Sequence, residues 1–263
     1  MKICVYSTHK FEVKYLKKAN NKKHKIKWLK SSLNKNTAVL AKGYDAVAIF
    51  ANDEATKSVL KRLKKVGVSM LALRSAGYNH VDLKAAKSLG FRVARVPEYS
   101  PYSVAEHTVA LMMCLNRKIL KAQNRIQDFN FSLDGLIGFD MNGKTVGIVG
   151  LGKIGQVVAK ILNGFGCKIL AHDVKEKEAL QKAYDLQYVD MDTLCKQSDI
   201  ITLHLPLSEE THYMINEAQI KKMKKGVMLI NTSRGGLVDT KAVIKALKRR
   251  HIGMLGLDVY ERE

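Results

Sequence analysis

A glycine-rich turn at residues 150–155 is the segment of this sequence whose chemistry is easiest to predict. It reads Gly-Leu-Gly-Lys-Ile-Gly and lies between an apolar strand pattern and a helical pattern. Gly150 would allow a tight turn, Gly152 would let the backbone approach a phosphate, and Gly155 would let the following helix pack closely. The free N–H groups at the start of that helix attract anions. In this context the pattern predicts a dinucleotide site, although a turn needed only for packing would show the same glycines.

An acidic residue follows the next apolar run. Residues 167–172 predict a strand, and Asp173 comes directly after it. A carboxylate at this place can accept hydrogen bonds from an adenosine ribose and would repel a 2′-phosphate. The sequence therefore favours NAD over NADP, and Lys175 close by weakens that preference slightly.

An arginine follows another apolar run, at residues 227–231. The predicted strand would deliver Arg234 to its carboxyl end, where ligands bind in α/β sheets. A guanidinium can hold a carboxylate with two parallel hydrogen bonds, and it can stabilise charge that develops on a carbonyl oxygen. Gly235 and Gly236 favour a site, because small residues let a ligand approach. A surface arginine in a turn fits the pattern equally well.

The last residues carry a second group of polar side chains. Asp258, Glu261 and Glu263 follow the strand expected at 254–258. Three acids after a strand would suit the rim of a site, but charged chain ends are more often solvated tails. The pattern alone does not choose between these interpretations.

Strands and helices alternate along the first hundred residues. Strands are expected at 2–6, 45–51, 69–73 and 91–95, and helices at 11–19, 54–65 and 82–89. The stretch from Val96 to Pro101 holds two prolines, which break regular structure, so we expect a domain boundary at about residue 100. A long core helix is expected from Val104 to Leu120.

The alternation begins again after residue 143. Strands are expected at 144–149, 167–172, 199–205, 227–231 and 254–258, and helices at 153–164, 217–224 and 239–250. Strands separated by helices imply parallel βαβ units with right-handed crossovers. The predicted fold class is α/β, with two doubly wound parallel-sheet domains, one flavodoxin-like and one Rossmann, and a cleft between them.

The chain is strongly basic. Of its 263 residues, 45 are Lys or Arg and 24 are Asp or Glu, which gives a formal net charge of +21. The lysine clusters at 17–30, 221–225 and 245–250 are scattered, and Trp28 is their only aromatic residue, which does not make a base-stacking surface. We predict no nucleic-acid partner, and a positive field that concentrates anionic substrates and dinucleotides near the surface.

The apolar runs and the cysteines indicate in which cellular compartment the protein is expected. No run of 18 apolar residues is present, and the N-terminus lacks the apolar region of a signal peptide. The cysteines are isolated and lack metal-ligand spacing, so we expect them to pack as small apolar residues. These features predict a cytoplasmic protein with no membrane partner and no metal site.

Several short stretches, taken in order, resemble one enzyme family. They are Leu73-Arg74-Ser75-Ala76-Gly77-Tyr78-Asn79, Val96-Pro97 with Tyr99, Ala105-Glu106-His107, Asn130-Phe131-Ser132-Leu133, the glycine turn, Asn231-Thr232-Ser233-Arg234-Gly235 and Gly256-Leu257-Asp258-Val259-Tyr260-Glu261. Each is weak alone, but their order and spacing resemble the D-2-hydroxyacid dehydrogenases, and most closely the bacterial fermentative members that form D-lactate. The resemblance covers essentially the whole chain.

The resemblance implies roles for individual residues. Arg234 would bind the carboxylate and the 2-oxo group of the substrate, and Glu263 would pair with a catalytic histidine. The backbone of Ala76 and Gly77 and the hydroxyl of Tyr99 would also contact the substrate. The cofactor-binding positions would be Gly150, Gly152, Lys153, Ile154, Gly155, Asp173, His204, Pro206, Thr232 and Asp258. Residues 1–100 would form the substrate domain, and residues 101–263 the NAD-binding Rossmann domain.

One part of the family pattern has no match here. The general acid of the family is a histidine a few dozen residues beyond the glutamate that Glu263 matches, and the sequence ends at Glu263. His80, His107 and His204 match other family positions, and we do not expect any of them to reach the substrate oxygen, as proton transfer requires. The expectation is a chain cut short at its C-terminus, with both domains incomplete there.

The reaction that the resemblance implies is the reduction of a 2-oxo acid, pyruvate, to a D-2-hydroxy acid, D-lactate, with NADH. Two alternatives stay open, a catalytically impaired NAD(H)-binding fragment or pseudoenzyme and a family member that acts on another 2-hydroxy acid. A homo-oligomer also stays open, because the long helix after Pro101 often forms a dimer contact in this family.

Overall fold

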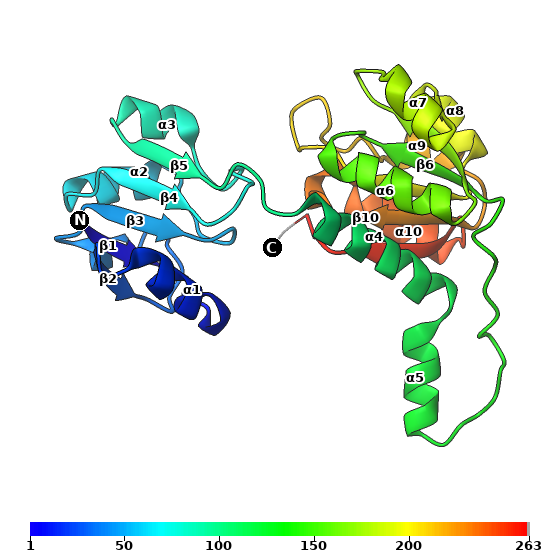
Figure 1. The fold of residues 1–263 in the computed structure, drawn as a ribbon, viewed down its shortest axis with the longest axis horizontal. Helices are drawn as coiled ribbons and strands as arrows, with labels where there is room; N and C mark the ends of the chain where they lie inside the picture. Colours follow the sequence, from blue (N-terminus) through cyan, green and yellow to red (C-terminus); the bar gives the residue numbers. More distant parts are fainter. Residues whose placement is uncertain (262–263) are drawn as a thin grey trace. The chain divides into compact units, whose positions relative to one another are not determined.

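The structure is a computed structural model that describes residues 1–261, and it divides into two compact units. The first unit runs from Met1 to Tyr99, and the second begins at Ser100. Each unit contains one parallel sheet with helices around it (Figure 1). The predicted α/β class with two parallel sheets is therefore confirmed.

The sheet of the first unit has five parallel strands in the order β2-β1-β3-β4-β5. The strands are β1 (Lys2–Val5), β2 (Lys25–Trp28), β3 (Ala46–Ile49), β4 (Met70–Leu73) and β5 (Arg92–Arg95). The connections contain α1 (Lys10–Asn20), a 3₁₀ turn (Ala38–Ala41), α2 (Lys57–Lys65) and α3 (Leu83–Ser88). This strand order is that of flavodoxin-like sheets.

The sheet of the second unit has six parallel strands in the order β11-β10-β9-β6-β7-β8. The strands are β6 (Thr145–Val149), β7 (Lys168–His172), β8 (Leu186–Tyr188), β9 (Ile200–Leu203), β10 (Val227–Asn231) and β11 (Ile252–Leu257). The helices are α4 (Pro101–Asn116), α5 (Ile119–Gln127), α6 (Lys153–Gly164), α7 (Glu178–Tyr184), α8 (Met191–Gln197), α9 (Glu217–Lys222) and α10 (Thr240–Lys248), with a 3₁₀ turn at Gly235–Leu237. The order is that of a dinucleotide-binding sheet, in which ligands bind where the strand order reverses, here between β6 and β9.

Helices cover both faces of the second sheet. Met112 of α4 and Leu162 of α6 belong to one buried apolar cluster, and Leu194 of α8, Ile220 of α9 and Val243 of α10 belong to another. Strands that are covered on both faces are expected to be apolar throughout, and all five residues of β10 are buried. The two layers hold the loops at the carboxyl edge of this sheet on a rigid base.

The single helix expected from Val104 to Leu120 is wrong at its end. It is two helices, α4 and α5, and Lys118 between them has φ 52°, a left-handed conformation that ends the first helix. The helix α5 and residues 128–140 extend away from the rest of the second unit (Figure 1). Several of their large apolar side chains are exposed, among them Phe129, Phe131 and Ile137.

Two strands, β2 and β8, were not expected from the sequence. Both lie at an edge of their sheet and are only four and three residues long. Edge strands are commonly short and charged, and Lys25 and Lys27 interrupt the apolar pattern of β2.

Cys4, Cys167 and Cys195 are buried, so the prediction that they pack as apolar residues is confirmed for these three.

Candidate active site

The glycine turn lies at the carboxyl end of β6, at the point where the strand order of the second sheet reverses. Gly150 has φ 95°, and a Cβ there would lie 2.7 Å from the carbonyl oxygen of His204. A Cβ on Gly155 would collide with the carbonyl of Gly150. A Cβ on Gly152, by contrast, would meet no atom within 4 Å in the described structure. Two glycines therefore serve packing, and Gly152 leaves an open cradle beside the first turn of α6, which suits a phosphate.

Asp173 lies beside this turn, directly after β7. Its Oδ2 accepts a hydrogen bond of 2.6 Å from the backbone N–H of Leu151, and its Oδ1 accepts one of 3.0 Å from the N–H of Lys175. An ionised carboxylate has about four acceptor positions, so two remain for ribose hydroxyls. Asp173 thus fixes the glycine turn as well as offering acceptors to a ligand, a second role that the sequence pattern did not reveal.

His204 follows β9, beside Gly150. Its Nε2 lies 3.0 Å from the hydroxyl of Thr202, whereas its buried Nδ1 has no hydrogen-bond partner among residues 1–261. Burial lowers the pKa of this imidazole to about 4, so the ring is neutral at neutral pH. A buried polar atom without a partner is costly unless a ligand or water satisfies it. Together with the cradle at Gly152, this atom shows that the residues present fit a dinucleotide.

The carboxyl end of β10 carries Arg234 in a tightly bonded turn. The buried side chain of Asn231 donates to the carbonyl of Arg234 at 2.8 Å and accepts from the N–H of Ser233 at 3.0 Å. The N–H of Asp258 donates to the carbonyl of Asn231 at 3.0 Å. Asn231 therefore joins the turn of Arg234 to the end of β11. We predicted no role for Asn231 from the sequence, although a polar residue at the end of an apolar strand was a signal that could have shown it.

Our interpretation of Gly235 as room for a ligand is wrong. A Cβ on Gly235 would collide with the backbone carbonyl of Tyr260, so the chain itself fills that space. The hydroxyl of Tyr213 donates to the carboxylate of Glu261 in the same region. The segment after β11 is thus packed directly against the residue that follows Arg234. Glu263, expected to pair with the catalytic histidine, lies outside the described residues.

The carboxyl edge of the first unit holds the loop expected to bind a carboxylate. The hydroxyl of Ser75 donates to the carbonyl of Gly77 at 2.7 Å, and the guanidinium of Arg95 donates to the carbonyl of Ala76 at 3.1 Å. These bonds use carbonyl oxygens of the loop and fix its path. Tyr99 is the last residue of this unit and is 68% exposed.

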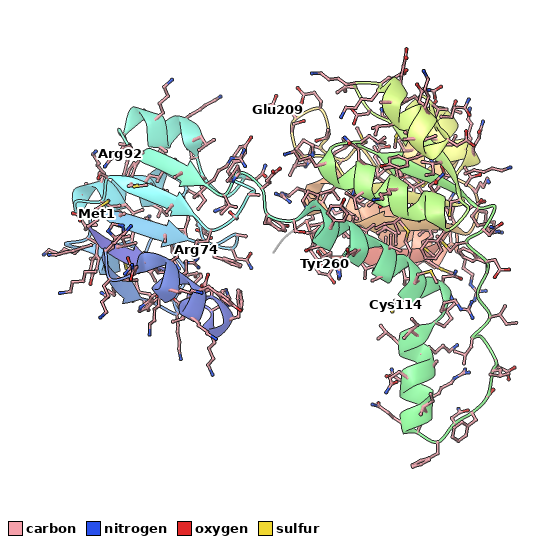
Figure 2. All side chains as sticks on the ribbon, viewed as in Figure 1. Met1, Arg74, Arg92, Cys114, Glu209 and Tyr260 are labelled. Atoms are coloured by element: carbon pink, nitrogen blue, oxygen red, sulfur yellow. The ribbon has the colours of Figure 1, made fainter. Side chains whose placement is uncertain are left out.

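Arg74, labelled in Figure 2, lies immediately before that loop, and its side chain is largely buried at 10% exposed. Its guanidinium donates to the carbonyls of Tyr6 and Ser7 at 2.9 Å, and its Nε lies 3.1 Å from the carboxylate of Glu12. Burial lowers the pKa of Arg74, while Glu12 and Asp53 act in the opposite direction. Arg74 therefore ties the ends of β1 and β4 together.

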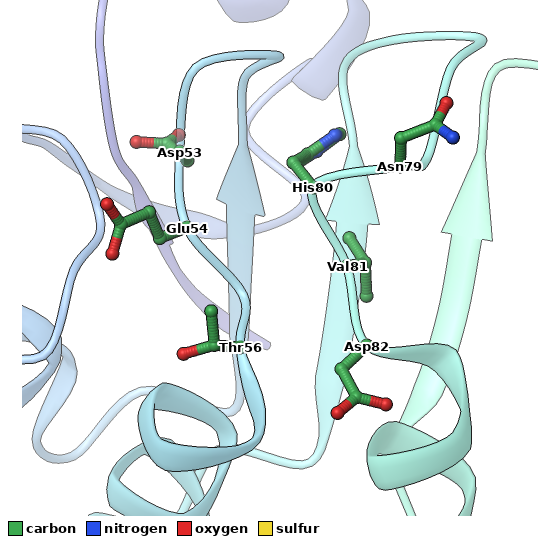
Figure 3. A pocket seen from close by; sticks show the side chains of 7 residues that line it. All are labelled: Asp53, Glu54, Thr56, Asn79, His80, Val81 and Asp82. Carbon is green, nitrogen blue, oxygen red and sulfur yellow. The ribbon is translucent and has the colours of Figure 1, made fainter. Parts of the chain in front are cut away.

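A pocket of about 320 Å³ lies in the first unit (Figure 3). Its lining is Asp53, Glu54, Thr56, Asn79, His80, Val81 and Asp82. Three carboxylates make this lining unsuited to an anionic 2-oxo acid. The residues predicted to bind substrate are not part of it.

The predicted residues of the second unit are placed at one edge of one sheet. Each follows the carboxyl end of a strand: the glycine turn follows β6, Asp173 follows β7, His204 follows β9, Thr232 and Arg234 follow β10, and Asp258 follows β11. Lys153 is exposed and Ile154 half-buried at the start of α6, and Pro206 is exposed after β9.

No three His, Cys, Asp or Glu side chains within residues 1–261 are grouped so that they could hold a metal ion. None of the helices that the structure describes is long and apolar enough to cross a membrane.

Comparison with known proteins gives consistent matches over the whole chain. A family model described as the NAD binding domain of D-isomer specific 2-hydroxyacid dehydrogenase matches residues 109–263. D-lactate dehydrogenase of Escherichia coli (strain K12) is 49% identical over 264 residues, which cover 100% of this chain and 80% of that protein. Its apo-structure aligns with a TM-score of 0.92 over 100% of this chain and 83% of that chain. D-lactate dehydrogenase from Aquifex aeolicus, in complex with NAD and lactic acid, aligns with a TM-score of 0.87 at 36% identity, over 98% of this chain and 77% of that chain.

Proposed function

This chain belongs to the family of D-isomer specific 2-hydroxyacid dehydrogenases, and we propose that it reduces pyruvate to D-lactate with NADH. The observation that carries the proposal is the position of Arg234 and of the glycine turn on one sheet edge. They follow β10 and β6, with only β9 between them. A 2-oxo acid held by Arg234 would then lie on the same edge as the dinucleotide, as hydride transfer requires.

NADH, when bound, supplies the hydride for C2 of the substrate. The first turn of α6 and the cradle at Gly152 would hold the pyrophosphate, and Asp173 would accept the ribose hydroxyls. His204 would offer its neutral imidazole to the adenosine side, with Pro206 beside it. Thr232 and Asp258 would meet the nicotinamide end. A 2′-phosphate would be repelled by Asp173, which supports NAD rather than NADP.

Arg234 would bind the substrate carboxylate and stabilise the negative charge that grows on the 2-oxo oxygen. In the first unit, the resemblance assigns substrate contacts to the backbone N–H groups of Ala76 and Gly77 and to the hydroxyl of Tyr99. Glu263 matches the glutamate that orients the family's histidine general acid, for which this sequence has no match, and a carboxylate there would raise the pKa of that histidine, because a nearby anion favours the imidazolium. In this scheme residues 1–100 are the substrate domain and residues 101–263 the NAD-binding domain.

A steady-state assay of the intact protein tests this proposal. NADH oxidation would be followed with pyruvate, with larger 2-oxo acids and with glyoxylate, and the configuration of the lactate formed would be determined. We expect pyruvate to give the highest kcat/KM and the product to be D-lactate. L-lactate as product, or a larger 2-oxo acid as the preferred substrate, would contradict the assignment.

The alternative is a protein that binds NAD(H) without turnover. It shares every cofactor contact proposed above and differs only in the chemical step. Saturable NADH binding together with no detectable NADH oxidation with any 2-oxo acid would favour it.

The exposed apolar residues of α5 and residues 128–140 also support self-association, as proposed for a homo-oligomer. Sedimentation of Phe129→Ser and Phe131→Ser variants, compared with the unchanged protein, would test that point.

A further inference from the structure

Two consecutive residues of α4 contact the residues expected at the nicotinamide end. Nε2 of His107 lies 3.3 Å from Oδ1 of Asp258. The hydroxyl of Thr108 lies 2.9 Å from the hydroxyl of Thr232 in a buried contact. The helix α4 therefore contacts both Asp258 and Thr232. The family pattern had suggested only a packing role for His107.

The contacts of Thr108 determine which of the two threonine hydroxyls donates to the other. The Thr108 hydroxyl carries one hydrogen and lies 2.8 Å from the carbonyl oxygen of Val104, which can only accept. Thr108 therefore donates to Val104, and the bond between the two threonines requires Thr232 to donate to Thr108. The hydroxyl hydrogen of Thr232 is then directed at α4, and only its acceptor positions remain for a ligand.

The His107 contact acts in the same way on Asp258. Nε2 of His107 lies beside one carboxylate oxygen of Asp258 in an ion-pair contact between two half-exposed side chains, and the backbone N–H of Asp258 donates to the carbonyl of Asn231 at 3.0 Å. The carboxylate is thereby oriented, and its second oxygen is an acceptor. Thr232 and Asp258 thus both present acceptors, and the matching ligand group is a donor such as a primary amide.

We propose that His107 and Thr108 are positioning residues that set Asp258 and Thr232 to accept hydrogen bonds from the carboxamide NH₂ of the nicotinamide. The inference rests on the proposed function, which assigns Asp258 and Thr232 to that end of the cofactor. Apolar contacts hold α4 in place independently, since Ala105 and Met112 are fully buried and Leu111 and Leu115 lie near Gly256. Removing the two polar contacts should therefore leave the helix where it is.

Calorimetric titration with NADH and with ADP-ribose, which lacks the nicotinamide, tests the proposal. We expect His107→Ala to weaken NADH binding about 2–5-fold, the range for a half-exposed ion pair, and to leave ADP-ribose binding unchanged. Thr108→Val should act in the same direction, and Thr108→Ser, which keeps the hydroxyl, should restore the original affinity. A general effect on folding would weaken both ligands alike.

A cofactor analogue identifies the donor directly. Reduced 3-acetylpyridine adenine dinucleotide carries a methyl group in place of the NH₂ and cannot donate. It should bind the unchanged protein more weakly than NADH does, and this difference should shrink in His107→Ala and Thr108→Val. An undiminished difference in both variants would overturn the proposal.

Two controls separate the possible failures. His251→Ala removes a histidine at the opposite end of β11, where Nε2 lies 3.1 Å from the carbonyl of Met223, and should not change the ratio of the two affinities. Asp258→Asn should weaken NADH relative to ADP-ribose. If it does not, the assignment of Asp258 to the nicotinamide fails. If Asp258→Asn changes the ratio but His107→Ala and Thr108→Val do not, only the role of α4 is overturned.

Discussion

The carboxyl edges of the two sheets use their polar groups differently. In the first unit the charges are matched within the protein, because the guanidinium of Arg74 faces Glu12 and donates to backbone carbonyls. Asp53, also buried, accepts hydrogen bonds from Ser7, from Leu33 and from Phe50.

The second unit leaves polar groups available at the carboxyl edge of its own sheet. Gly152 faces open space, and Nδ1 of His204 has no hydrogen-bond partner in the part of the chain that the structure describes. Asp173 keeps acceptor positions beyond its two backbone donors. Charges matched within the protein hold the loops of the first edge in place, whereas the open space at Gly152 and the remaining acceptor positions of Asp173 suit the second edge to a dinucleotide.

The largest expected effect concerns the second edge. Arg234→Gln in the intact protein should lower kcat/KM for pyruvate by roughly 10³-fold, because a charged hydrogen-bond donor to the developing alkoxide is lost. NADH affinity should stay within about twofold, since Arg234 is not expected to contact the cofactor. Stopped-flow kinetics and calorimetry measure the two quantities. Retained turnover together with lost NADH affinity would contradict the role given to Arg234.

The next effect concerns the first edge. Arg74→Leu should destabilise the first unit by about 3 kcal/mol, the lower end for a buried ion pair, because it leaves the largely buried Glu12 carboxylate without its partner. Arg92→Leu is the matched control, since Arg92 is exposed on β5 (Figure 2), and it should change stability by less than about 0.5 kcal/mol. Urea unfolding measures both. Equal effects of the two substitutions would show that Arg74 is not a structural clamp.

A pH dependence follows from His204. Its pKa is lowered from 6.5 to about 4 in the folded state, so between these values the unfolded chain binds more protons. Folding stability should therefore be complete above pH 6.5 and fall by roughly 2–3 kcal/mol as the pH drops to 4. His204→Gln removes this titration. Unfolding curves of the two proteins should converge towards pH 4, and a constant difference at every pH would speak against a buried neutral imidazole.

The smallest effect separates the two roles of Asp173. Asp173→Asn keeps an acceptor for the N–H of Leu151 but loses the charge, whereas Asp173→Ala loses both. Both should reduce the preference for NADH over NADPH by about tenfold, equal to 1.4 kcal/mol. Only the alanine variant should also weaken NADH, because the glycine turn loses its anchor. An unchanged cofactor preference in both variants would exclude the ribose role.

The sequence predicted the central strands and the strand ends that carry the candidate site residues, for a physical reason. Buried parallel strands are continuous apolar runs, and the glycines of the turn are required by close contacts that only glycine permits. The edge strands β2 and β8 lack that signal, since one face of their backbone is exposed and charged residues are tolerated there. The break between α4 and α5 depends on the conformation of Lys118, which no apolar period reveals.

Within the site, contacts between distant residues were beyond prediction. Asn231, His107 and Thr108 act through partners that the fold brings together, and Gly235 proved to accommodate Tyr260 rather than a ligand. Sequence spacing shows which strand end a residue follows, but not which side chain from another element meets it there.

Hydrogen–deuterium exchange with and without NADH tests the contrast between the two edges most directly. On addition of NADH we expect the strongest protection in peptides that cover residues 150–155, with further protection at 173–175 and 204–206. Peptides that cover the Arg74 network, at residues 6–12 and 50–53, should change little. No protection at the glycine turn, or its strongest protection in the first unit, would contradict the assignment of the second edge to the dinucleotide.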